Sequence, residues 1–268
     1  MKVLVVGSII LISATLSAPL LAANEENVWM KTDRRTISIG MFFLEEDTQV
    51  RVSSDLLGRG TLVDFQDDLG LDEDDEAVRL VGHYRFKPRH RINFGYFKIS
   101  SDATTTVLRD IIFDDEIFTT GTTVDSELGF TFISILYTYS FFQNDTVDLG
   151  VSTGVNIYEF ESSLTAPATG IEQDGDGTAP FPVFGLRLLW NFKPKLSLAA
   201  SLDYFEINEG DIEGEVIDLL VALDHQTWTN AGLGLGYNEV SIEAENTEQG
   251  DELDWDYDGF FGYVKFRF

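Results

Sequence analysis

The chain has 268 residues, no cysteine, a formal net charge of −28 at pH 7, and 44% hydrophobic and 13% aromatic residues. The absence of cysteine excludes a disulfide framework, a thiol nucleophile and a cysteine zinc site, and the negative charge disfavours a nucleic-acid partner by repulsion. Because a disordered acidic chain would be far less apolar and aromatic, we expect one large folded domain.

The N-terminus has the pattern of a secretory signal. Lys2 supplies a positive charge, residues 3–21 form an almost uncharged apolar run, and Ala22 and Ala23 precede the polar Asn24. We therefore expect residues 1–23 to be a signal peptide and residues 24–268 to be the exported domain. An uncleaved membrane anchor is the alternative, but the apolar run is short for a span. No later apolar run reaches the length that a spanning helix needs.

After residue 35, apolar and polar residues alternate with a period of two, which predicts β-strands. The alternation is clearest between Val147 and Ile157. Residues 60–65 form either a further strand or a hairpin within a loop, so eight or twelve strands remain as alternatives to ten. The ten expected strands cover residues 36–53, 76–87, 90–102, 122–141, 146–164, 180–192, 195–206, 215–226, 230–245 and 254–268.

The connections between these strands are of two kinds. Four are short and basic or flanked by aromatic residues, at 86–90, 141–145, 190–195 and 225–230, and five are longer and acidic, at 54–76, 102–122, 164–180, 206–215 and 246–253. Short turns at one end and longer loops at the other are typical of a membrane barrel. A girdle of aromatic rings at the membrane interface is expected from Tyr84, Phe86, Tyr137, Tyr139, Phe141, Trp190, Phe192 and Trp228.

The last strand carries a family resemblance. Phe260, Val264, Phe266 and Phe268 occupy alternate positions and end at the carboxylate. This pattern resembles the terminal strand of bacterial outer-membrane barrels, which the assembly machinery of that membrane recognises. The resemblance implies an all-β, transmembrane, antiparallel up-and-down barrel in the outer membrane of a Gram-negative-type cell. It further implies a monomer in contact with lipid and lipopolysaccharide, but it does not indicate an activity.

Strand parity directs a set of charged residues into the lumen of such a barrel. A ten-stranded lumen is narrow, so these side chains are expected to meet in a packed network of ion pairs and hydrogen bonds. We therefore expect a largely occluded, polar lumen and a structural, surface-interaction or small-solute role, and a narrow porin-like channel is the alternative. The predicted network comprises Arg79, His83, Arg85, Arg91, Arg187, Asp148, Asp203, Asp218 and Asp224.

No catalytic motif emerges, and an outer-membrane hydrolase is the third hypothesis. Ten strands resemble the omptin proteases, whose site needs acidic residues beside a histidine, but the only adjacent pair here, Asp224 and His225, would point to opposite faces of a strand. We therefore expect no enzymatic activity.

Metal binding has only weak candidates. Asp174 and Asp176 lie in a stretch that resembles the start of a calcium loop but lacks the downstream glutamate. We expect no cofactor and no metal site, with loosely bound Ca²⁺ or Mg²⁺ at the acidic loops as the alternative.

Overall fold

Ten long antiparallel strands form one closed sheet in the computed structural model, which describes residues 34–54 and 56–268. They are β1 (Arg35–Arg51), β3 (Asp74–Lys87), β4 (His90–Thr106), β7 (Thr123–Gln143), β8 (Val147–Ala166), β9 (Ile171–Lys193), β10 (Leu196–Glu209), β11 (Ile212–His225), β12 (Ala231–Asn246) and β13 (Asp251–Arg267). The expected signal peptide, residues 1–23, lies outside the described residues. No helix that could cross a membrane occurs in the described part of the chain.

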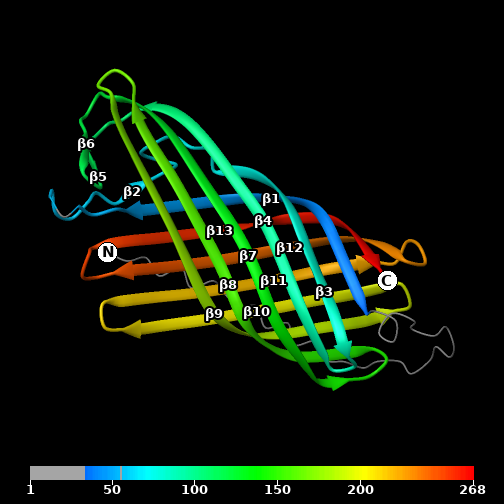
Figure 1. Cartoon of the computed structure of the whole chain (residues 1–268). Coiled ribbons are helices and arrows are strands. Elements are labelled where there is room, and N and C mark those ends of the chain that lie inside the picture. The colour runs from blue at the N-terminus through cyan, green and yellow to red at the C-terminus, as the bar shows by residue number, and fades with distance from the viewer. Residues whose placement is uncertain (1–33, 55) are drawn as a thin grey trace, which may run out of the picture.

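The sheet closes because β13 pairs back onto β1, from Arg267 opposite Thr36 to Glu252 opposite Arg51. From β1 to β12, each long strand also pairs with the next long strand in the chain. In Figure 1, the front strands β3, β4, β7, β8 and β9 cross the rear strands steeply, as tilted strands of a closed barrel do. The prediction of an up-and-down barrel with ten strands is confirmed.

Three short strands belong to loops. β2 (Val63–Asp64) pairs with the end of β1, so residues 60–65 lie in a loop and add no strand to the barrel wall, while β5 (Ile111–Phe113) and β6 (Glu116–Phe118) form a separate hairpin. The two loops hydrogen-bond to each other, since Thr61 N donates to Ile112 O over 2.8 Å. We call these loops, residues 52–54, 56–73 and 107–122, the cap.

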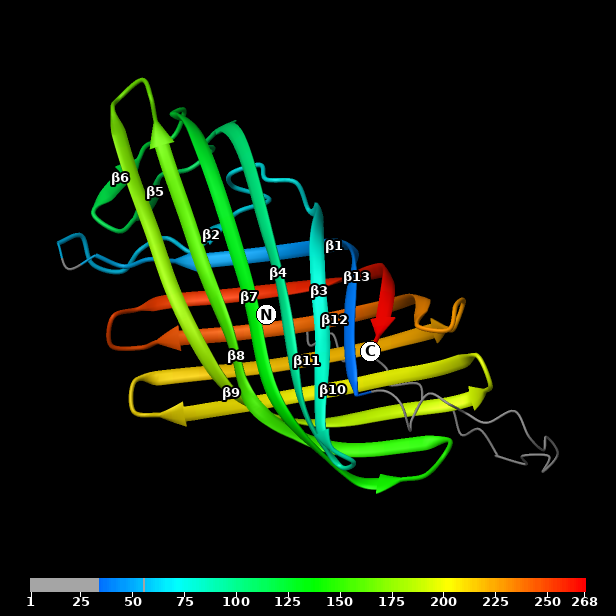
Figure 2. The ribbon, with the colours of Figure 1, turned by 45° about the vertical axis from the view of Figure 1, so that its right-hand side comes forward.

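Three of the five predicted long loops are largely strand, which corrects the expectation for 164–180, 206–215 and 246–253. The hairpins turn only at residues 167–170, 210–211 and 247–250. Two of the turns are tight because Gly170 (φ 72°) and Gly210 (φ 65°) adopt a left-handed conformation that glycine tolerates. Continued pairing satisfies the backbone of these acidic segments. Figure 2 shows the β8–β9 hairpin projecting well beyond the rear strands.

The polarity of the barrel wall reverses along the strands. On β7, the outward residues change from Asp125 and Glu127 to Ile135, while the inward residues change from Phe130 to Ser134. The same reversal occurs elsewhere in the barrel wall, at Phe43 on β1 and Phe260 on β13, which are register partners. The strands therefore reverse their polarity at corresponding heights of the wall, and this boundary divides the barrel into two parts.

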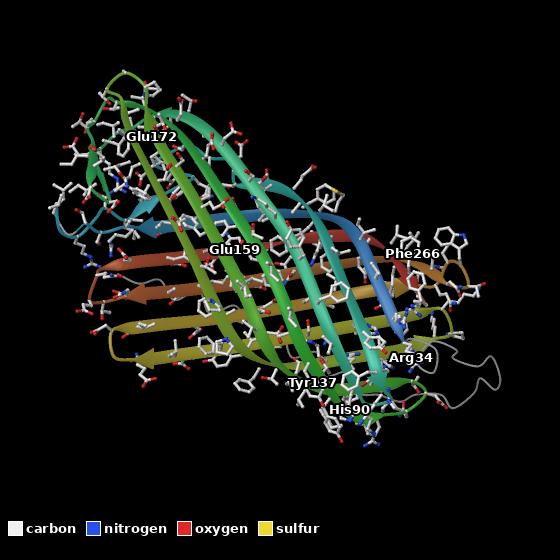
Figure 3. The ribbon with its side chains drawn as sticks, in the orientation of Figure 1. Arg34, His90, Tyr137, Glu159, Glu172 and Phe266 are labelled. Carbon is white, nitrogen blue, oxygen red and sulfur yellow. The ribbon has the colours of Figure 1, made fainter. Side chains whose placement is uncertain are left out.

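We call the part with an apolar outer face the belt, and the part with a polar outer face, together with the cap, the extension. The belt contains the short turns, the C-terminus and outward residues such as those at 37–43, 133–141, 196–204 and 260–268. Figure 3 labels Tyr137, His90 and Phe266 towards the belt end and Glu172 at the far tip of the extension. An outward apolar band with aromatic residues at its rim is how a barrel meets lipid.

The interior of the extension is an apolar core. Phe42, Phe97, Phe130 and Trp255 are buried across the lumen, and the Phe130 and Trp255 rings stack with centroids 3.7 Å apart. The cap adds buried apolar side chains from both of its loops, namely Val63, Phe65, Leu69, Leu71, Val107, Ile111, Phe113 and Phe118. The expectation of a polar lumen is therefore wrong for this half, because water surrounds the outside of the extension and its apolar residues turn inward.

Candidate functional sites

The lumen of the belt holds the predicted charged network. Arg85 donates to Asp148 over 2.9 Å, and Arg187 donates to Asp203 over 2.6 Å. Asp148 and Asp203 are both nearly inaccessible to solvent, so these are buried ion pairs. Asp218 accepts a hydrogen bond from Asn238 over 2.7 Å, and His83 shares one with Thr36 over 2.8 Å. Arg91 is buried on the same inner face.

Two members of the network have partners that strand parity did not reveal. Asp224 pairs with Lys265 over 2.5 Å and accepts a hydrogen bond from Tyr263 over 2.8 Å, so its cation is a lysine of the last strand. Arg79 lies over aromatic rings, with its guanidinium carbon 4.8 Å from the centroid of Phe261 and 5.2 Å from that of Phe42. The apolar core begins at the level of Arg79, so its guanidinium rests on these rings, and its membership of the charged network stays a prediction.

A second group of charges lies on the outer face of the extension. Glu45 is the register partner of Asp258, which is also opposite Glu239, and Asp47 is opposite Asp256. Like charges in directly opposed positions destabilise a sheet. We call these outward carboxylates of β1, β12 and β13 the acidic grid: Glu45, Asp47, Glu239, Asp254, Asp256 and Asp258.

Repulsion within the grid appears in the proton affinities of its members. Burial first, and then the neighbouring Asp256 and Glu243, raise the pKa of Asp254 to about 6. Burial, then Asp64 and Asp256, raise the pKa of Asp47 above its ordinary value. A bound cation would relieve this repulsion.

A groove of about 460 Å³ runs beside the grid, between the barrel wall and the cap residues Asp64, Gln66, Asp67 and Glu73. Glu46 lines it and is only 4% exposed. Its Oε2 accepts a hydrogen bond from Trp255 Nε1 over 3.3 Å, whereas its Oε1 has no hydrogen-bond partner among the described residues. Burial and then the nearby Asp75 raise the pKa of Glu46 to about 7.

The cations of the extension are already paired with other carboxylates. Arg51 contacts Glu252 over 2.5 Å, and Lys98 contacts Glu161 over 3.6 Å. Arg59 lies near Glu252, and Arg109 binds Asp68. No ion pair among the described residues involves a member of the acidic grid, so no basic side chain neutralises its charge.

The three histidines of the chain all lie in the belt half. His83 is in the lumen, the Nδ1 of His90 is 2.6 Å from the hydroxyl of Tyr137, and the Nδ1 of His225 is 3.3 Å from Thr227. Asp224 is buried and His225 is exposed, so this adjacent pair points to opposite faces as the alternation predicts. The expectation of no enzymatic activity stays a prediction.

The remaining candidate residues lie on outer faces. Asp174 and Asp176 are exposed on β9 opposite Ser163 and Glu161, so the expected calcium-like loop is strand. No cluster of acidic, histidine or cysteine residues suited to a metal occurs among the described residues. Phe260, Phe266 and Phe268 are exposed on the outer face of the belt, with Val264 on the same face, and their role in assembly stays a prediction.

Sequence reasoning missed the acidic grid and Glu46. The sequence does contain a sign of the polar outer face to which the grid belongs. The apolar residues of β8 change from odd to even positions after Ile157, so the polarity of the strand reverses there. A strand that changes its apolar face without a bulge has changed its surroundings.

No family model and no curated protein matches the sequence. Among solved structures, the outer-membrane protease OmpT from Escherichia coli matches with a TM-score of 0.58 at 11% identity, covering 88% of this chain and 97% of that one. The translocator domain of the autotransporter NalP from Neisseria meningitidis matches with a TM-score of 0.46 at 10% identity, covering 87% and 88%. Ail from Yersinia pestis matches with a TM-score of 0.40 at 10% identity, covering 86% and 99%. The chain therefore shares the fold of outer-membrane β-barrels, with ten strands.

Proposed function

We propose that this barrel is a non-conducting surface-binding protein whose extension binds a cationic macromolecule, such as a basic protein or peptide, outside the cell. The observation that carries the proposal is the acidic grid, where carboxylates oppose one another across three paired strands. Such repulsion lowers the stability of the sheet, and positions where a sequence keeps a destabilising arrangement of this kind are expected at functional sites.

The groove supports a ligand that supplies positive charge. It is lined by grid members, cap carboxylates and the buried Glu46, whose Oε1 faces no donor among the described residues. An ammonium or guanidinium group entering the groove would satisfy this oxygen and neutralise its neighbours. The surrounding negative field would also speed the encounter with a basic partner.

The closed extension supports binding over the alternative of conduction. The apolar core and the cap fill the lumen above the belt, and dry aromatic packing offers no hydrated path for ions. We do not extend the protease activity of OmpT to this chain, because its histidines lie in the half of the barrel opposite the groove.

The test is a titration of the protein in lipid nanodiscs with a decalysine peptide, by calorimetry over a range of salt concentrations. We expect saturable binding that weakens as salt rises, and no binding of decaglutamate. Neutralising Glu239, Asp256 and Asp258 (E239Q, D256N, D258N) should weaken binding about tenfold or more. The matched control neutralises three exposed carboxylates of β9 (E172Q, D174N, D176N) and should change affinity much less.

Equal losses in both triple variants would contradict a defined site, since they would indicate diffuse attraction to the whole surface. Competition by micromolar Mg²⁺ would make a metal ion the occupant and would also contradict the proposal. Stepwise currents from the wild-type protein in planar bilayers would overturn its non-conducting part.

A further inference from the structure

The lumen of the belt contains a partly open cavity of about 250 Å³, far from the acidic groove. Its walls are mostly apolar, with Leu136, Leu220 and Ala222 among them, and the rings of Phe132 and Phe261 close it towards the extension. Thr36, Lys265 and Arg267 line the side towards the short turns, so the cavity is reached from that end.

Arg79 lies at the closed end of this cavity and is only 8% exposed. Its guanidinium rests on the rings of Phe42, Phe97 and Phe261, at 4.8 to 5.9 Å from their centroids. Its Nη1 is buried without a hydrogen-bond partner among the described residues. A buried guanidinium without an acceptor is costly, and an anion in the cavity would satisfy it.

The packing of β12 shapes this end of the cavity. Gly234 and Gly236 face inward, and a Cβ atom at either position would lie within 2.3 Å of the rings of Tyr263 and Phe261 respectively. The alternating glycines therefore admit these rings, and the Phe261 ring in turn supports Arg79. The guanidinium is thus held in place by packing before any ligand arrives, which reduces the entropy lost on binding.

The charges around the cavity select the class of ligand. Arg187 and Lys265 are paired with Asp203 and Asp224, and the wall also holds Asp218, Arg91 and Arg267. Counted with Arg79, its cations outnumber its carboxylates, so the cavity favours an anion. A single carboxylate matches the planar fork of one arginine. The apolar walls suit an apolar body attached to that carboxylate.

We propose that the belt cavity binds a compact organic monocarboxylate from the short-turn side, with its carboxylate on Arg79 and its apolar body against Phe132, Leu220 and Phe261. The site is independent of the acidic grid, and either proposal can fail without the other. Occupancy would be signalled by a gain in stability, because a ligand that binds only the folded barrel stabilises it.

The test uses benzoate as the probe, with the full chain folded in lipid nanodiscs and binding measured by calorimetry. Benzylamine, which has the same ring and the opposite charge, and inorganic phosphate are the comparison ligands. We expect saturable benzoate binding, with benzylamine and phosphate binding at least about tenfold more weakly.

Two variants test the place of binding. Arg79→Met keeps the length of the side chain and removes its charge, and should weaken benzoate binding about tenfold or more. Lys98→Met, which removes a cation from the outer face, is its control and should leave affinity unchanged. If Arg79→Met does not fold, Ala199→Leu fills the cavity while Arg79 remains, with Ala231→Leu on the outer face of β12 as its control.

Loss of benzoate binding in Arg79→Met or Ala199→Leu, with both controls unchanged, would support the site. Benzoate affinity unaltered by the cavity variants would overturn it, as would equal binding of benzylamine, which would indicate partition of the ring into lipid. Phosphate binding as tight as that of benzoate would overturn the assignment to a monocarboxylate.

Discussion

The belt and the extension are made of the same ten strands, yet they solve opposite problems of solvation. In the belt, lipid surrounds the wall, so apolar residues face outward and the narrow lumen must accommodate charges in ion pairs such as Arg85–Asp148. In the extension, water surrounds the wall, so carboxylates face outward and aromatic residues such as Trp255 fill the lumen. Period-two alternation thus shows only that the two faces of a strand differ in polarity. Whether the apolar face points outward or inward depends on whether lipid or water surrounds the wall.

The largest effect should come from the core of the extension. Trp255→Ala removes a buried ring that stacks on Phe130, and should lower the free energy of unfolding by about 3–5 kcal/mol. Phe260→Ala, on the lipid face of the same strand, leaves no internal cavity and should cost much less. Urea unfolding of both variants in lipid vesicles measures the difference. Equal losses would mean that the two halves are not packed differently.

A comparable effect is expected from the lumen of the belt. Arg85→Ala leaves Asp148 buried without its arginine, with an expected loss of about 3–5 kcal/mol. Lys98→Ala breaks an exposed pair with Glu161 and should cost under about 1 kcal/mol. Adding Asp148→Asn to Arg85→Ala should restore part of the stability. No recovery in that double variant would show that the arginine acts through packing and not through charge.

An intermediate effect should appear as a pH dependence confined to the extension. The pKa of Glu46 is raised to about 7 in the folded protein, so the folded state holds this proton more tightly than the unfolded state. The contribution of Glu46 to stability is therefore present at low pH and is lost as the pH rises from its unfolded pKa through about 7. The loss should be about 3 kcal/mol.

Unfolding measurements at about pH 5 and about pH 8 test this, with Glu46→Gln as the variant that cannot titrate. The variant should show a flatter profile over this range. Asp254→Asn should flatten it less, because the pKa of Asp254 rises only to about 6. A wild-type profile that rises towards pH 8 would contradict the assignment.

The smallest effect on stability should come from the end of the last strand. Phe268 is exposed on the lipid face, so deleting it removes little buried area. If the terminal pattern directs assembly, the amount of folded, heat-modifiable protein in the outer membrane should nevertheless fall. Refolding of the purified variant in detergent serves as the control and should be normal. Unchanged assembly in cells would count against the signal.

The sequence by itself predicted a barrel of about ten strands, with eight or twelve as alternatives, and it predicted most of the charged side chains that enter the lumen, although not Lys265. Both properties follow from local alternation, since neighbouring residues of a strand point to opposite faces. The reversal at Ile133 and Ile157 was also visible in the sequence, although the acidic strands beyond it have the composition of loops.

Only the tertiary structure decided which groups meet. Parity places Arg79 and Asp224 inside, but the stagger of the strands brings Lys265 to Asp224 and aromatic rings to Arg79. It also brings the carboxylates of β1, β12 and β13 side by side, although β1 and β13 lie at opposite ends of the chain. Register and closure depend on all ten strands together, and for that reason the partners of a side chain across the lumen cannot be obtained from the alternation of a single strand.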